Sequence, residues 1–352
     1  MMVIAALVAA ACTSTPSEPV RATAEAAPTS LSPAISAGLD KAIQDAMVAG
    51  SVPGAIVAIS APEGRFVRAY GLADTADKIA MDPAMSTRIA SVTKTFTVTA
   101  VLQLVDEGKL ALDDPIGDHL PGVPNGDRIT IRHLAGMRSG LPDYAADSDF
   151  SIAYKLDPSV GWQPDQLLTY AFDKPVQFEP GERFSYSSTN TILLGQLIEK
   201  ISGTSLSDYL DRRILAPVGL SGTALPDDAT LPEPHMRGYT TTGGNFVETT
   251  AWNPIWGWAA GGIVSTVDDL GRWIQAIANG SLLSVETQQA RMDFQPTDDP
   301  TFGYGLGLHR ARRLDPPLRL HAGLPDVRGL PARRQGLSGR RDQHRRRGLY
   351  ER

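Results

Sequence analysis

The sequence predicts an α+β fold, in which an antiparallel sheet built from both chain ends is flanked by helices and carries an inserted, mainly helical lobe. An amphipathic segment at 36–49 precedes two apolar runs at 54–59 and 65–70, an order typical of a helix followed by a β-hairpin. Residues 91 to about 280 show helical spacing interrupted by loops, and strand character returns at 301–309. Because strands at both ends form one sheet only if the ends meet, we expect the insertion to pack beside it, with a cleft between.

The first helix and the hairpin have recognisable ends. Leu39, Ile43 and Met47 recur at helical spacing, and Gly50 follows as a stop signal. Pro62-Glu63-Gly64 separates the two apolar runs, and this composition is typical of a tight turn.

Later elements are marked in the same way. Residues 191–202 carry apolar side chains at helical spacing and end at Gly203. Ser205 and Ser265 each precede an aspartate by three positions, which predicts a capping box at the start of a helix. A last strand is predicted at 318–321.

The N-terminus resembles a bacterial lipoprotein signal. Residues 3–11 form an uninterrupted apolar run ending at Cys12, the only cysteine, and residues 13–35 are rich in Pro, Ser and Thr, as a flexible linker would be. We therefore expect residues 1–12 to direct export and Cys12 to carry a lipid anchor on the outer face of a membrane of the bacterial cell envelope. The alternative is simple cleavage before the linker. With one cysteine, no disulfide can form within the chain.

Charge divides the chain near residue 311. Residues 311–352 contain 12 Arg and four acidic residues, a net charge of +8, which leaves −14 for residues 1–310 of a chain with a net charge of −6. The acidic body argues against nucleic acid as a partner. We interpret 311–352 as a frame-shifted or disordered extension, so that the C-terminal strands and helix of the fold are missing or altered. The folded domain is then 36–310.

Ser91 and Lys94 are the first candidates for catalytic residues. Residues three positions apart lie on one face of a helix, and no charged residue follows Lys94 before Asp106, so this helix is expected to cross the interior. Burial lowers the pKa of a lysine, and a lysine held against a serine can help to remove its proton. The alternative is a lysine at a helix end that reaches water.

Further segments in a fixed order extend this signal. They read Arg-Ile-Ala-Ser-Val-Thr-Lys at 88–94, Ile-Thr-Ile-Arg-His-Leu and Ser-Gly-Leu-Pro within 129–142, Pro-Gly-Glu-Arg-Phe-Ser-Tyr-Ser at 180–187 and Ala-Gly-Gly-Ile-Val-Ser-Thr at 260–266. Together they resemble the serine β-lactamase-like, penicillin-recognising family: class C β-lactamases, D-alanyl-D-alanine carboxypeptidases and related esterases. The resemblance covers about residues 36–310 and implies a β-lactamase/transpeptidase-like fold.

The resemblance implies roles for individual residues. Ser91 attacks a carbonyl to form an acyl-enzyme. Tyr186 acts as general base for Ser91 and then as general acid to the leaving group, if Lys94 depresses the pKa of its phenol and the two groups titrate as a unit. The Ser91 backbone N–H contributes to the oxyanion hole. Trp256 matches the aromatic residue of the cleft wall in position, with plain packing as the alternative.

Two positions depart from the family pattern. Ser188 stands where the second motif, Tyr-x-Asn, usually has its asparagine, and a hydroxyl replaces one hydrogen bond of an amide but not both. This favours a carboxypeptidase-like or esterase-like role over efficient β-lactam hydrolysis. His321-Ala322-Gly323 fits the third motif, with Leu324 supplying the second oxyanion N–H, but the residues that follow lack the usual run.

We therefore expect a monomeric serine hydrolase that needs no cofactor and acts on D-Ala-D-Ala-type peptides, β-lactams or small esters. The six histidines are scattered, so no metal site is predicted. One alternative is an esterase of the same fold with little β-lactam activity. Another is a non-catalytic protein that binds cell-wall fragments.

Overall fold

The computed structural model of the chain describes residues 30–242 and 245–311. The helices of eight or more residues are α1 (Pro33–Gly50), α2 (Thr93–Asp106), α5 (Ser148–Leu156), α6 (Pro164–Phe172), α7 (Ser188–Ser202) and α11 (Val267–Asn279). Shorter helices are α3 (Ile116–His119), α4 (Ile131–Ala135), α8 (Leu206–Leu210), α9 (Ala216–Val218), α10 (Trp258–Gly261) and α12 (Val285–Arg291). The strands are β1 (Gly54–Ala61), β2 (Gly64–Asp74), β3 (Ile79–Ala80), β4 (Thr87–Arg88), β5 (Tyr239–Thr242), β6 (Asn245–Glu248), β7 (Val264–Ser265), β8 (Gln295–Pro296), β9 (Phe302–Tyr304) and β10 (His309–Ala311). Antiparallel strands with a mainly helical insertion confirm the predicted α+β class.

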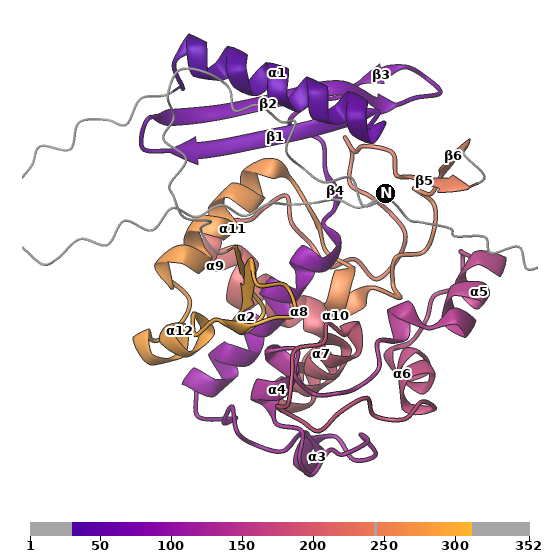
Figure 1. Ribbon diagram of the computed structural model, residues 1–352, viewed down its shortest axis with the longest axis vertical. Helices are drawn as coiled ribbons and strands as arrows, with labels where there is room; N and C mark the ends of the chain where they lie inside the picture. The colour runs from indigo at the N-terminus through magenta and orange to yellow at the C-terminus, as the bar shows by residue number, and fades with distance from the viewer. Residues whose placement is uncertain (1–29, 243–244, 312–352) are drawn as a thin grey trace, which may run out of the picture. The chain divides into compact units, whose positions relative to one another are not determined.

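The N-terminal layer follows the sequence pattern closely. The Ser32 side chain accepts a hydrogen bond from the Ile35 N–H, and α1 runs on to Gly50. β1 and β2 then pair antiparallel from Gly54 opposite Gly71 to Ala61 opposite Gly64, which confirms the hairpin. In Figure 1, α1 lies along one side of this sheet and α11 along the other.

The antiparallel strands form separate small sheets in the described residues. β1, β2 and β3 make one three-stranded sheet, and β8, β9 and β10 make another. The stretch predicted as one strand at 301–309 is a hairpin instead, because the chain turns at Gly307, which has a φ of +73°. The strand predicted at 318–321 lies outside the described residues.

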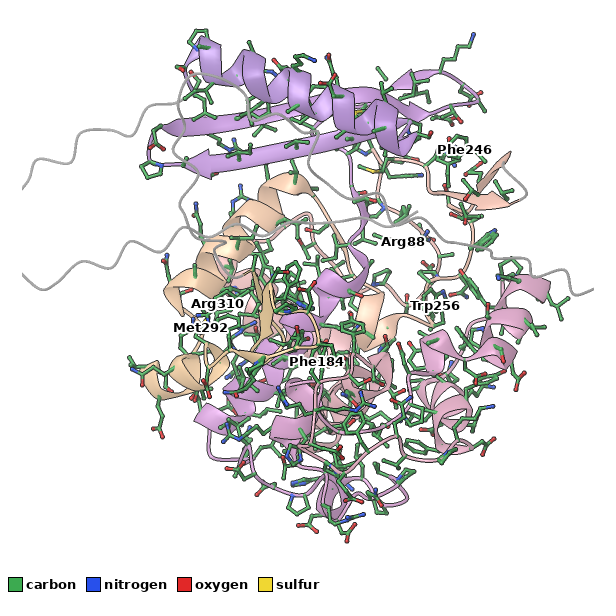
Figure 2. The ribbon with its side chains drawn as sticks, viewed as in Figure 1. Arg88, Phe184, Phe246, Trp256, Met292 and Arg310 are labelled. Carbon is green, nitrogen blue, oxygen red and sulfur yellow. The ribbon has the colours of Figure 1, made fainter. Side chains whose placement is uncertain are left out.

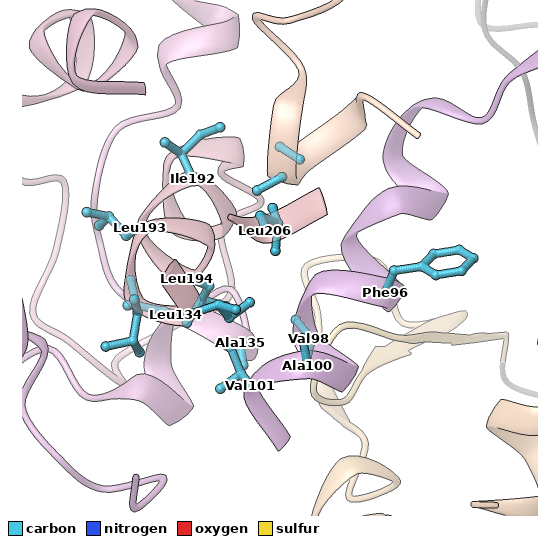
Figure 3. Close-up of a cluster of buried hydrophobic side chains, with 14 of the residues drawn as sticks. Phe96, Val98, Ala100, Val101, Leu134, Ala135, Ile192, Leu193, Leu194 and Leu206 are labelled. Atoms are coloured by element: carbon cyan, nitrogen blue, oxygen red, sulfur yellow. The ribbon is translucent and has the colours of Figure 1, made fainter. Parts of the chain in front are cut away.

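The core of the helical insertion lies between α2 and α7. Val101 of α2, Ala135 of α4 and Leu194 of α7 are almost fully buried and gather at this contact (Figure 3). α10 closes against α7 at Gly195, where an added Cβ would come within 2.6 Å of the Ala259 Cβ. Ten of the fifteen residues of α7 are buried, so hydrophobic packing rather than helix propensity stabilises it.

One predicted cap is confirmed and one is wrong by a residue. Ser205 accepts a hydrogen bond from the Asp208 N–H at the start of α8. At α11 the cap is Thr266, which accepts from Asp269, whereas Ser265 belongs to β7 and its hydroxyl bonds to Thr223. A threonine directly after the serine offers the same acceptor, and strand pairing of Ser265 with Thr87 decides between them.

α11 is attached to α2 through Trp273, and this contact gives the first testable prediction. The Trp273 ring stacks on Phe96 with centroids 4.0 Å apart, and its Nε1 donates to the Thr95 hydroxyl at 2.8 Å. We expect Trp273→Ala to lower the free energy of unfolding by about 3–5 kcal/mol, measured by chemical denaturation. Leu156→Ala, at a side chain 81% exposed, should change it by less than about 0.5 kcal/mol. Equal effects of the two variants would contradict this account of the core.

Candidate active site

Ser91 lies in a tight turn at the head of the buried helix α2. Residues Ala90–Val92 form a 3₁₀ turn that continues directly into α2, and Ser91 is exposed. Ala90 has a φ of +47°, a left-handed conformation that costs a residue with a Cβ about 1–3 kcal/mol. The strained turn therefore holds the Ser91 hydroxyl at an accessible position while the rest of the helix stays covered.

Lys94 lies one turn further along α2, only 3% exposed. Its Nζ donates to the Ala260 carbonyl at 2.8 Å and lies 3.3 Å from the Ser91 Oγ. Burial lowers the pKa of Lys94 to about 8, against an opposing influence of the Asp143 carboxylate. Lys94 therefore loses its proton more readily than an ordinary lysine, and it lies in hydrogen-bonding reach of the serine.

The fourth sequence segment, at 260–266, holds α2 in place. Lys94 binds this segment through the Ala260 carbonyl. In addition, the Thr97 hydroxyl donates to the Ala259 carbonyl at 2.7 Å, and the Ile263 N–H donates to the Thr93 hydroxyl at 3.1 Å. Both threonine side chains are fully buried. The threonine hydroxyls on α2 thus form hydrogen bonds with backbone groups in and next to α10. These bonds hold the Ala260 carbonyl beside the Lys94 amine.

Tyr186 lies against Lys94, just before α7. The Lys94 Nζ is 4.9 Å from the centroid of the Tyr186 ring, a cation–π contact when the amine is charged. Burial raises the pKa of Tyr186 to about 12; the Ser91 side chain opposes this shift and Asp143 adds to it. The direction is opposite to the depressed pKa expected from the sequence, because loss of water around the buried phenol disfavours its charged form. Tyr186 is therefore a neutral phenol, able to donate a proton.

Ser188, at the start of α7, is in contact with Asp143. The Ser188 N–H donates to the Asp143 Oδ1 at 2.9 Å. Burial raises the pKa of Asp143 above its ordinary value, although the backbone and side chain of Ser188 oppose this shift. Sequence reasoning missed Asp143, although the carboxylate directly follows the Ser139–Pro142 segment that carried part of the resemblance. No sequence pattern near Asp143 indicates that this loop packs close to α2 and α7.

Trp256, labelled in Figure 2, packs against other aromatic side chains. Its ring lies 5.8 Å from Phe150 and 5.4 Å from Tyr154 between centroids, and its carbonyl accepts a hydrogen bond from the Tyr144 hydroxyl at 2.6 Å. These contacts support the packing alternative: Trp256 fixes Tyr144, the neighbour of Asp143.

A hollow lined in part by His309 lies near Tyr186. The His309 ring is 6.4 Å from the Tyr186 ring and 4.5 Å from that of Tyr304. Sequence reasoning placed His309 only at the end of a strand and missed its place near the site. The hollow has a volume of about 350 Å³ and is lined by Phe184, Thr297, Asp298, Asp299, Phe302 and His309.

The remaining predicted site residues, Cys12, His321, Gly323 and Leu324, lie outside the described residues. Within 30–242 and 245–311, no helix is both long and apolar enough to cross a membrane. The same residues contain no group of three or more His, Cys, Asp or Glu side chains placed to bind a metal ion.

Comparison with known proteins shows a family and several solved structures that the chain resembles. The Beta-lactamase family matches residues 39–331. A D-stereospecific amidohydrolase from Streptomyces sp. is similar in structure, with a TM-score of 0.71 and 31% identity over 77% of this chain and 81% of that one. D-amino acid amidase from Ochrobactrum anthropi SV3 gives a TM-score of 0.69 and 32% identity, over 78% and 81%.

A curated relative, Protein flp of Staphylococcus aureus (strain N315), is 28% identical over 243 residues. The match covers 67% of this chain and 48% of that protein. The chain thus spans about half the length of the curated relatives it matches first.

The environment of Lys94 gives a second prediction. We expect the Lys94 amine to titrate near pH 8, because burial removes the water that would stabilise its charge. The measurement is NMR of protein labelled with ¹³C at the lysine Cε, with the signal assigned by its loss in Lys94→Met. Titration near pH 10.4, the ordinary lysine value, would show that the amine is solvated and would contradict the described site.

Proposed function

The chain belongs to the beta-lactamase family, and on this premise we propose that it is a serine hydrolase that forms an acyl-enzyme through Ser91 on small amides and esters. One observation carries the proposal: a lysine amine that is almost fully buried lies 3.3 Å from the hydroxyl of an exposed serine. A serine becomes a nucleophile when an adjacent base takes its proton, and a desolvated lysine is such a base.

The pKa directions assign the two proton-transfer roles. Neutral Lys94 accepts the Ser91 proton as the Oγ bonds to the substrate carbonyl carbon, whose oxygen becomes an oxyanion. The Ser91 N–H, near the start of α2, donates to this oxyanion at the positive end of the helix dipole. Tyr186, a neutral phenol, then donates its proton to the leaving nitrogen or oxygen as the carbonyl re-forms and that bond breaks.

Deacylation reverses these roles with water in place of the leaving group. Water attacks the ester carbonyl and gives a proton to the Tyr186 phenolate, and Ser91 leaves with the proton held by Lys94. Each turnover adds one water and restores both groups. The second oxyanion donor, Leu324, and the third-motif His321 stay predictions within this mechanism.

We rank amides and short peptides of D-amino acids first among the substrates. The supporting observation is similarity to a D-stereospecific amidohydrolase and a D-amino acid amidase at 31–32% identity. D-Ala-D-Ala-type peptides, β-lactams and small esters follow. Ser188 brings no side-chain amide to the second motif, which supports low β-lactam turnover. Export and lipid attachment at Cys12 belong to the same proposal, supported by the apolar run at 3–11.

Steady-state kinetics test the proposal. We expect hydrolysis of D-phenylalanine p-nitroanilide to fall at least about 10³-fold in Ser91→Ala and in Lys94→Met, since each removes one half of the nucleophile–base pair. Lys155→Met, at an exposed lysine of α5, is the matched control and should keep wild-type rates.

The pattern across substrates separates the alternatives. Turnover of p-nitrophenyl acetate alone would identify the esterase. Acylation of Ser91 without turnover would identify the binding protein. Wild-type rates in Ser91→Ala would contradict the assignment of the nucleophile.

A further inference from the structure

We propose that Asp143 is a positioning residue for Lys94 and that it takes over, beside Ser188, the place of the asparagine in the usual second motif. The inference rests on the proposed function, since it concerns the base of that reaction. The family pattern Tyr-x-Asn brings an amide towards the lysine, and in this chain Tyr186-Ser187-Ser188 lacks it. The structure instead places a carboxylate from another loop, that of Asp143, against the backbone N–H of Ser188 at 2.9 Å.

Four consecutive residues at the start of α7 fix the loop that carries Asp143. Each bonds to a residue between 139 and 143: Ser187 Oγ to Pro142 O at 3.1 Å, Ser188 N to Asp143 Oδ1 at 2.9 Å, Thr189 Oγ1 to Pro142 O at 2.6 Å, and Asn190 Oδ1 from Ser139 Oγ at 2.6 Å. Asp143 Oδ1 also accepts from the Ala145 N–H at 3.1 Å. The same oxygen is therefore fixed by two backbone donors, and the carboxylate cannot turn away without losing both.

The charge of this carboxylate acts on the amine without direct contact. The groups in contact with the Lys94 amine are the Ser91 hydroxyl, the Ala260 carbonyl and the Tyr186 ring. The Asp143 carboxylate acts on the pKa of the amine through its charge. Within the described part of the chain, no carboxylate oxygen lies within 4.0 Å of the Lys94 Nζ. A direct ion pair would hold the lysine protonated, whereas a carboxylate further away stabilises the charge and leaves the amine free to bond to Ser91.

Asp143 also acts on the acid of the reaction. It raises the pKa of Tyr186 and of the buried Tyr144, in the same direction as burial. The His309 ring lies 6.4 Å from that of Tyr186 and 4.5 Å from that of Tyr304. One carboxylate thus favours a protonated phenol and a more basic amine together, which is the pairing that the proposed proton transfers need.

The test is the pH profile of Asp143→Asn. Asparagine keeps the Oδ1 acceptor for both backbone N–H groups and removes the charge. We expect the acidic limb of kcat/KM to move to lower pH by about one unit, because loss of a nearby negative charge disfavours the lysine ammonium. The plateau should fall several-fold, since a base with a lower pKa removes the serine proton less well. The ratio of variant to wild-type activity should therefore rise as the pH falls.

Asp147→Asn is the matched control. Asp147 caps α5 through the Asp149 and Phe150 N–H groups, as Asp143 caps its own turn, and we expect no movement of the limb there. A loss of activity caused only by damage to the loop would lower all points of the profile equally and overturn the proposal.

A second variant of Asp143 and a direct titration of Lys94 distinguish loss of the charge from poor folding. Asp143→Ser also removes the charge and retains a capping hydroxyl, and should give the same shift if the asparagine variant folds poorly. The NMR titration of Lys94 should move to lower pH in either variant, with or without substrate turnover. An unmoved Lys94 titration overturns the role of Asp143, whereas a moved titration in a protein that hydrolyses nothing overturns the proposed function alone.

Discussion

The amine of Lys94 lies out of water between helices that are far apart in the sequence, and a charge in such a place is costly unless polar groups surround it. The protein supplies the Ala260 carbonyl, the Ser91 hydroxyl, the Tyr186 ring and, at longer range, Asp143. Each comes from a different segment. The packing of α2, α7 and α10 is therefore also the means by which the lysine acquires its reactivity.

The same constraint explains why so many hydroxyls line the buried face of α2. Thr93 and Thr97 bond to the α10 segment, and Thr95 accepts from the indole of Trp273. An apolar α2 would pack as well, but it would leave the backbone of the α10 segment without partners where it approaches the helix. The threonines keep the Ala260 carbonyl in place, and that carbonyl accepts from the amine.

The sequence was sufficient to predict the features that depend on residues close together in the chain. Three positions between Ser91 and Lys94 fix one face of a helix, and the hairpin from Gly54 to Asp74 follows from alternation and a turn. It could not reach Asp143, because hydrogen bonds from the start of α7 bring that loop to the lysine. It also missed the raised pKa of Tyr186, because the degree of burial is a property of the assembled site.

If Lys94 makes Ser91 a nucleophile, intact-protein mass spectrometry after treatment with a fluorophosphonate should detect the activated serine. The reagent needs only an activated serine, which displaces fluoride, so the test does not depend on the natural substrate. We expect one adduct, mapped to the peptide that contains Ser91, absent from Ser91→Ala and formed at least about 10²-fold more slowly in folded Lys94→Met. Labelling of Ser91 at the same rate with and without the lysine would contradict the account.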